Sequence, residues 1–156
     1  MELEKAKKIA AALLSYKSYT CKEVYQRLVR KGVDQDTAEL AVSEFCRAGI
    51  LNDEEYARLY IHDAMVLGMK GMFRIKQELH AKGIAGSVID KAAETVDVDA
   101  YEQLEGYVKL RFGDKEFSDR RELEKAKAHL ARRGYSLSEI NKCFKNLKIT
   151  VRSEEF

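Results

Sequence analysis

Apolar residues recur along this chain in one fixed order, which is written three times between stretches of charged residues. In each copy they fall at positions i, i+3 and i+7 before a glycine, and at i, i+3, i+4 and i+7 after it. Residues at these intervals share one face of an α-helix, so each copy predicts two amphipathic helices with buried stripes. In the first copy the stripes consist of Cys21, Val24 and Leu28, and then of Ala38, Ala41, Val42 and Phe45.

A glycine marks the corner between the two helices of each copy. The three are Gly32, Gly83 and Gly134, and successive positions differ by 51 residues in both cases. Glycine adopts the left-handed conformation that ends many helices without a steric cost, and the Lys or Arg before it complements the negative helix end. A fixed period of this size is typical of proteins built from supersecondary repeats.

Further start signals predict a third helix in each copy. In the first copy we expect one helix over residues 3–16. A capping box at Thr20 and Glu23 then predicts a second helix to about Lys31, and a third follows to about residue 47. The connection between the first and second helices varies among the copies and is longest in the third.

We therefore expect an all-α fold of three tandem three-helix repeats, stacked into an elongated, curved body. The predicted repeats cover residues 1–50, 51–97 and 98–148. Residues 149–156 continue no helical pattern, and we expect a frayed C-terminal tail there.

The composition agrees with a helical protein and narrows its class. Charged residues make up 35% of the 156 positions, and the chain has no proline and no tryptophan. No run approaches the roughly 20 apolar residues of a membrane span, and the N-terminus has no signal-peptide pattern, so we expect a cytoplasmic protein without membrane contact. A net charge of +2 excludes a strongly cationic nucleic-acid binder, although cations gathered on one face would still allow DNA contact. We also expect a monomer.

Cysteine and histidine give no sign of a metal or redox centre. The cysteines lack C-x-x-C spacing; Cys21 and Cys143 occupy buried columns and are interpreted as core residues, while Cys46 receives no role. The three histidines lie among charged residues and are expected to be solvated. The chain also lacks the phosphate-binding, dinucleotide-binding and zinc-protease motifs. We therefore predict no catalytic, cofactor-binding or metal-binding residue, no cofactor, and no enzymatic activity.

The remaining candidates for function are basic residues near the corners. Lys31, Lys82 and Arg133 occupy one register position, and Arg30 and Arg132 precede two of them. Two interpretations stay open: these cations cap the helix ends, or they form a row that contacts phosphates or an acidic partner. With a second cluster near the middle loop, the candidate partner-binding or DNA-binding residues are Arg30, Lys31, Lys70, Arg74, Lys76, Lys82, Arg132 and Arg133.

Three segments in the middle of the chain resemble the central signature of RecX proteins, which are bacterial regulators of the RecA recombinase. They are residues 51–57 (LNDEEYA), 68–71 (GMKG) and 75–84 (IKQELHAKGI). Each motif alone is weak, but their order and the two flanking copies make the resemblance fairly specific. It extends from about Lys5 to Leu147, and RecX proteins are likewise built from tandem three-helix units.

The resemblance implies a protein that lies in the helical groove of the RecA–single-stranded DNA filament and inhibits recombination, ATP hydrolysis and co-protease activity. It places the chain in DNA repair and the SOS response. ATP and magnesium would belong to RecA, and direct binding to single- or double-stranded DNA would be weaker. Among motif positions, Lys70, Arg74 and Lys82 are plausible contacts, whereas Ala57 and Leu79 are packing residues. Tyr135 replaces the aliphatic residue that is usual after the third glycine. This departure from the family pattern affects only the expected packing at that position.

Two other functions remain open beside a filament regulator. Three-helix units with a turn before the last helix resemble helix-turn-helix modules, so the chain could bind DNA directly. Against this, the predicted third helices over residues 36–47 and 87–96 carry few Arg or Lys residues. A helical scaffold for an unrelated protein is the other alternative.

Overall fold

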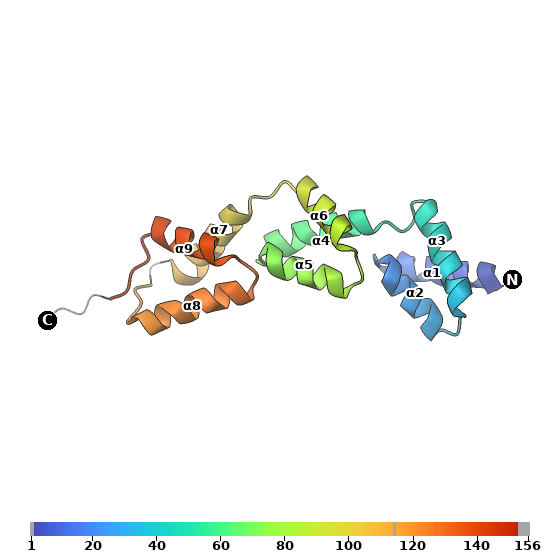
Figure 1. Ribbon diagram of the computed structural model, residues 1–156, viewed down its shortest axis with the longest axis horizontal. Helices are drawn as coiled ribbons and strands as arrows, with labels where there is room; N and C mark the ends of the chain where they lie inside the picture. Colours follow the sequence, from blue (N-terminus) through green and yellow to red (C-terminus); the bar gives the residue numbers. More distant parts are fainter. Residues whose placement is uncertain (1, 114, 153–156) are drawn as a thin grey trace. The chain divides into compact units, whose positions relative to one another are not determined.

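The computed structural model describes residues 2–113 and 115–152 of the chain. Over these residues the regular structure consists of nine α-helices without a β-strand, so the all-α prediction is confirmed (Figure 1). In chain order the helices are α1 (Glu2–Tyr16), α2 (Cys21–Arg30), α3 (Gln35–Arg47), α4 (Asp53–Val66), α5 (Met72–Ala81), α6 (Gly86–Thr95), α7 (Ala100–Phe112), α8 (Arg120–Arg132) and α9 (Leu137–Asn146).

Polar side chains at the N-termini explain where several helices begin. Before α2, the Thr20 Oγ1 accepts a hydrogen bond from the Glu23 N–H at 3.2 Å, and the Glu23 carboxylate accepts one from the Thr20 N–H at 2.9 Å. This reciprocal pair is the predicted capping box, and it satisfies backbone donors that the first helical turn leaves open. Asp34, Asp99 and Ser136 also accept first-turn N–H groups, at α3, α7 and α9.

The three predicted corners share one backbone geometry. Gly32, Gly83 and Gly134 have φ angles of 96°, 91° and 104°. In each corner the residue after the glycine donates its N–H to the carbonyl five positions earlier, and the pairs are Val33 with Leu28, Ile84 with Leu79, and Tyr135 with Leu130. This is the Schellman arrangement, which closes a helix through a left-handed residue. The predicted glycine corners are therefore confirmed.

The chain divides into two compact units. The first contains residues 1–60 and 78–95, and the second contains residues 61–77 and 96–156, so α4 and α5 each contribute to both. In the first unit α1, α2 and α3 pack around one core. Its buried residues are Ala6, Ala10, Val24, Leu28, Val33, Ala38, Ala41, Phe45 and Leu51. The innermost positions of the predicted stripes lie in this core.

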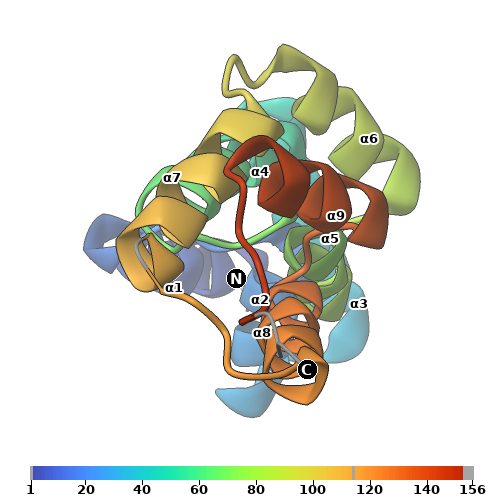
Figure 2. The same ribbon diagram turned by 90° about the vertical axis from the view of Figure 1, so that its left-hand side faces the viewer.

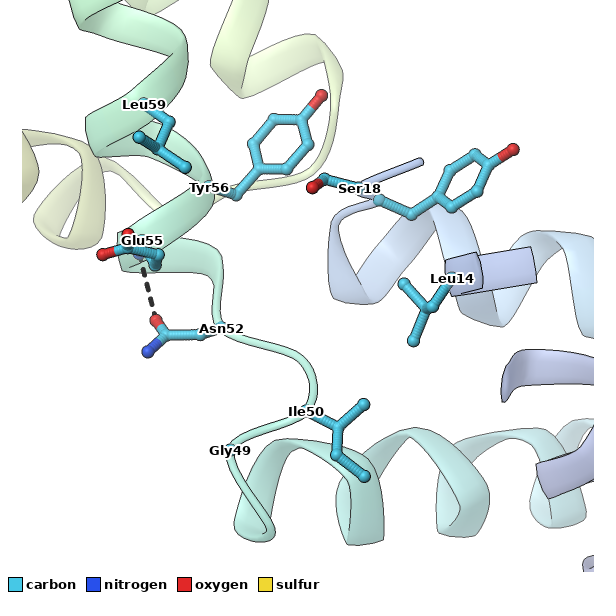
Figure 3. A pocket seen from close by; sticks show the side chains of 9 residues that line it. Leu14, Ser18, Gly49, Ile50, Asn52, Glu55, Tyr56 and Leu59 are labelled. Carbon is cyan, nitrogen blue, oxygen red and sulfur yellow. Dashed lines mark hydrogen bonds between the residues drawn. The ribbon is translucent and has the colours of Figure 1, made fainter. Parts of the chain in front are cut away.

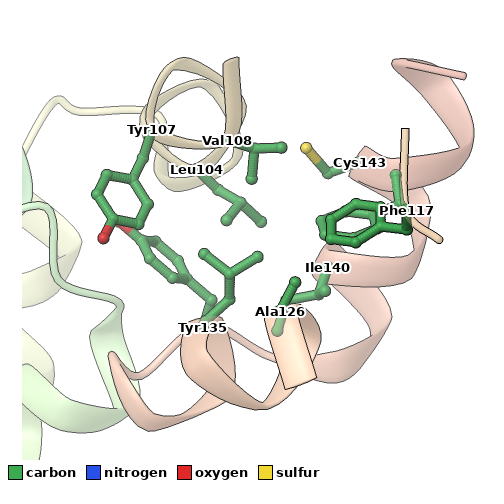
Figure 4. Packing of buried hydrophobic residues seen from close by; sticks show 10 residues of the cluster. Leu104, Tyr107, Val108, Phe117, Ala126, Tyr135, Ile140 and Cys143 are labelled. Carbon is green, nitrogen blue, oxygen red and sulfur yellow. The ribbon is translucent and has the colours of Figure 1, made fainter. Parts of the chain in front are cut away.

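The second unit has its own core, which α7, α8 and α9 share (Figure 4). The side chains of Leu104 and Val108 from α7 point toward Ile140 and Cys143 from α9. The complete buried set is Leu104, Tyr107, Val108, Phe117, Ala126, Leu130, Tyr135, Ile140, Cys143 and Phe144. Tyr135 is buried, so the aromatic replacement after the third glycine keeps the inward role of that position.

The segment after α9 corrects the predicted tail. Phe117 donates its N–H to the Thr150 carbonyl at 3.2 Å, and its own carbonyl accepts the Arg152 N–H at 2.6 Å. Figure 2 shows the red segment after α9 running to the connection before α8, where Phe117 forms a bridge with Val151. Ile149 and Val151 also pack against the core of the second unit. The frayed-tail prediction is therefore wrong for residues 149–152, and its remainder, 153–156, lies outside the described residues.

Candidate partner-binding surface

The eight predicted basic residues differ in exposure. Arg30, Lys31 and Arg132 are exposed at the ends of α2 and α8. The other five are half-buried and are Lys70, Arg74, Lys76, Lys82 and Arg133. Because equivalent register positions face different surroundings, the corner cations do not form one uniform set.

Lys82 lies in the first unit, where the corner after α5 meets the start of α2. Its carbonyl accepts a hydrogen bond from the Thr20 hydroxyl at 2.8 Å, and Thr20 is fully buried. The Lys82 Nζ lies 3.7 Å from a Glu23 carboxylate oxygen and 5.7 Å from the centre of the Tyr60 ring. The backbone and the side chain of Lys82 thus both hold this corner in place.

Arg133 holds an equivalent corner in the second unit, where the end of α8 meets the loop before α5. Its Nε donates to the Met69 carbonyl at 2.8 Å, and its Nη2 donates to the Gly68 carbonyl. The Arg133 carbonyl accepts the Gly71 N–H at 2.8 Å. Its guanidinium also lies 5.1 Å from the centre of the Tyr107 ring, a distance that allows a cation–π interaction.

The space around each corner glycine shows how closely other parts of the chain pack against that corner. A Cβ at Gly134 would lie 2.6 Å from the Arg74 N and 2.7 Å from the Gly71 carbonyl oxygen, and a Cβ at Gly83 would collide with the Lys22 side chain. A Cβ at Gly32 would meet nothing within 4 Å. The second and third corners are therefore packed against helix N-termini, while the first faces open space.

Arg133 gives a direct test of this structural role. Replacing it with methionine removes the donors to the Gly68 and Met69 carbonyls while keeping an apolar stem, so we expect the free energy of unfolding to fall by about 2 kcal/mol. Urea denaturation followed by circular dichroism measures the change. Arg132→Met is the matched control, because Arg132 is exposed, and it should change stability by less than about 0.5 kcal/mol. Equal losses in the two variants would contradict the assignment.

Two of the candidate sites are extended by further exposed cations, which the sequence analysis did not single out. Arg27 lies one turn before Arg30 and Lys31 on α2, with its guanidinium 4.7 Å from the centre of the Tyr19 ring. We call Arg27, Arg30 and Lys31 the α2 basic patch. On α8, Arg121 and Lys125 are exposed and share a helical side with Arg132. At the 51-residue period Arg121 and Lys125 align with Lys70 and Arg74, so the register was an available signal for both. Arg27 aligns with Glu78 and His129, and helical spacing was its only signal.

A hollow of about 200 Å³ lies in the first unit between the end of α1 and the start of α4 (Figure 3). Leu14, Ile50 and Leu59 provide apolar lining, and Ile50 and Leu59 are among the exposed large hydrophobic residues. At its rim the Asn52 side chain accepts the Glu55 N–H at 3.1 Å. Ser18 and Glu55 add polar lining, so the hollow is of mixed character. Nothing in the sequence pattern predicted it, because Ile50 lies outside the helical stripes.

Histidine behaves partly as predicted. His62 and His80 are exposed. His129 is half-buried, with its Nε2 3.0 Å from the Tyr107 hydroxyl, so the prediction that it is simply solvated is wrong. Partial burial lowers the pKa of the His129 imidazole, and the positive charges of Arg111 and Arg133 add to this effect.

Over the described residues there is no group of three His, Cys, Asp or Glu side chains that could hold a metal ion. Nor does any described helix have the length and apolar character needed to cross a bilayer. The accessible features of the described residues include cationic patches and hollows, which are means of contacting another macromolecule.

Comparison with known proteins assigns the family. A model of the first three-helix domain of RecX matches residues 6–45, and a model of the second matches residues 52–92. The chain is 30% identical over 137 residues to "Regulatory protein RecX" of Halorhodospira halophila, which covers 88% of this chain and 84% of the relative. It is 33% identical over 134 residues to the protein of the same name from Amycolatopsis mediterranei, covering 85% and 77%.

A solved structure agrees with this assignment. The crystal structure of RecX from Lactobacillus salivarius superposes with a TM-score of 0.80 at 25% sequence identity, covering 94% of this chain and 97% of that one. The matches to both three-helix domains, the similarity to the two relatives and the shared fold lead to one conclusion. The chain belongs to the RecX family of regulatory proteins.

Proposed function

We propose that this protein binds the RecA–single-stranded DNA filament in its helical groove and inhibits the recombinase, ATPase and co-protease activities of RecA. Membership of the RecX family is the observation that carries the proposal. In this proposal the protein acts as a cytoplasmic monomer, is not an enzyme and needs no cofactor of its own. Its role belongs to DNA repair and the SOS response.

The repeated architecture supports this function. We propose that residues 98–148 form a third three-helix repeat beside the repeats at 1–50 and 51–97, since α7, α8 and α9 have a core of their own and end α8 in the same glycine corner. A filament is also periodic, so similar units along one chain can contact successive protomers. Several modest contacts then add as avidity without a single large interface.

The exposure of the cations suggests which of them contact the partner and which hold the fold together. The α2 basic patch and the exposed side of α8 are free to meet an acidic partner surface, whereas Lys82 and Arg133 hold corners in place. Lys70, Arg74 and Lys76 are half-buried and already interact within the chain. We therefore propose that Arg30, Lys31 and Arg132 make the principal charged contacts and that the other five cations chiefly set the geometry.

Charge reversal in the α2 basic patch tests the contact. We expect Arg30→Glu with Lys31→Glu to raise the concentration for half-inhibition of RecA ATP hydrolysis on single-stranded DNA about tenfold, or about 1.4 kcal/mol of binding. The control is Lys5→Glu with Lys8→Glu, which reverses two exposed charges on α1 and should change the value by less than threefold. A similar loss in both variants would mean that net charge, not this patch, governs inhibition.

Direct DNA binding is the alternative, and the exposed Arg121, Lys125 and Arg132 on α8 favour it. A helix-turn-helix contact with DNA is less suitable at α6. The only Arg or Lys within α6 is Lys91, whose Nζ lies 3.7 Å from a Glu54 carboxylate oxygen. The ATPase assay separates the two functions when run in salt that abolishes the protein's own DNA binding. Inhibition that persists there supports filament binding, and inhibition that disappears with DNA binding supports competition for DNA.

A further inference from the structure

Two cysteines from different helices lie next to each other in the first unit. Cys21 is the first residue of α2 and Cys46 lies near the end of α3, and their Sγ atoms are 2.9 Å apart. Both are free thiols. A disulfide joins sulfur atoms at about 2.05 Å, so these two would need to approach by less than about 1 Å. The third cysteine, Cys143, is fully buried in the core of the second unit.

The surroundings of the pair allow a small oxidant to enter. Cys46 is exposed, and Cys21 is half-buried at the wall of an open hollow of about 350 Å³, which Tyr25 and Val42 also line. Burial raises the pKa of the Cys21 thiol, and its neighbours Cys46 and Asp53 act in the same direction. Cys46 is thus the sulfur that an oxidant meets first, and Cys21 waits beside it as the second thiol.

We propose that Cys21 and Cys46 form an oxidation site, which closes to an intramolecular disulfide when the protein meets a hydroperoxide and reopens with a dithiol reductant. The Cys46 thiolate attacks one peroxide oxygen, which yields a sulfenic acid and releases one water or alcohol. The Cys21 sulfur then attacks the Cys46 sulfur, the S–O bond breaks, and the hydroxide leaves as water with the Cys21 proton. Two thiols are oxidised and one peroxide is reduced. The dithiol reductant returns both thiols and becomes a disulfide itself.

The position of the pair gives the crosslink a structural consequence. The Cys21 N–H donates to the Asp53 carboxylate at 2.9 Å, and the preceding Thr20 holds the Lys82 carbonyl. A disulfide would therefore tie the end of α3 to the place where α4 begins and the second corner docks. It would also close a loop between positions 25 apart in the sequence, which restricts the unfolded chain. We expect the oxidised protein to unfold at a midpoint about 5 °C higher.

The experiment treats the full-length protein with hydrogen peroxide and then with dithiothreitol. Thiol titration under denaturing conditions should fall from three thiols to one, with an intact mass lower by two hydrogens. Peptide mapping should join the peptides of Cys21 and Cys46 within one chain and leave Cys143 reduced. Dithiothreitol should restore all three thiols. A crosslink between two chains, or a Cys46 sulfinic acid beside a free Cys21, would overturn the proposal.

Cys46→Ser is the matched variant, because this exposed position tolerates a hydroxyl without disturbing the core. It should keep both remaining thiols unjoined and lose the rise in the unfolding midpoint. If the variant still gains the rise on treatment, the stabilisation has another source and the proposal fails. All of these measurements are made on the isolated protein. Their outcome is therefore independent of whether the chain binds the RecA filament.

Discussion

Replacing Phe117 with alanine should lower the free energy of unfolding of the second unit by about 4 kcal/mol. Phe117 is only 1% exposed although it lies between helices, in the connection from α7 to α8. Its ring centre lies 5.9 Å from that of Phe112 and 6.4 Å from that of Phe144. Alanine would leave a cavity among these rings and would remove the aromatic contacts as well. Urea denaturation with circular dichroism measures the loss.

Phe73→Ala is the matched control for this result. Phe73 belongs to the same unit, but 69% of it is exposed. Truncating it removes little buried surface, and we expect a change within about 0.5 kcal/mol. A loss at Phe117 no larger than the loss at Phe73 would contradict the burial of the interhelical connection.

Phe117 also shows where sequence reasoning reaches its limit. The helical period predicted the inner columns, and Leu28, Leu79 and Leu130 are all fully buried. A residue in a connection has no periodic neighbours, so its burial gives no signal of that kind. The Phe117 ring lies in the core against Phe112 and Phe144, and the segment after α9 pairs with its backbone. That pairing joins parts of the chain that no repeat relates, and it also explains why the predicted fraying of residues 149–152 is wrong.

The sequence likewise predicted only part of the candidate site. The register identified Lys31, Lys82 and Arg133 as equivalent, and it offered helix capping as one of two explanations. It could not show that Lys82 and Arg133 are held by other helices, because that depends on what packs against each corner. Arg27 was missed for a different reason. Its equivalents in the other two copies are Glu78 and His129, so no Lys or Arg recurs at that register position.

The corner glycines provide the second large effect. Gly134→Ala should lower the free energy of unfolding by about 3 kcal/mol or more, since two costs add. Gly134 has a φ of 104°, a backbone conformation that is strained for any residue with a Cβ. That Cβ would also lie 2.6 Å from the Arg74 N and 2.7 Å from the Gly71 carbonyl oxygen. Backbone atoms cannot move aside as a flexible side chain can, so the corner must open.

Two further variants separate these costs. Gly32→Ala carries the strain of a positive φ (96°) with nothing within 4 Å of the new methyl group, and it should cost about 1 kcal/mol. Gly71→Ala carries no positive φ, but its Cβ would collide with the backbone of Gly134 and Tyr135, and we expect about 2 kcal/mol or more. Urea denaturation of all three variants measures the differences. Equal losses at Gly32 and Gly134 would mean that the third corner is as open as the first, and the structural role of Arg133 would then fail with it.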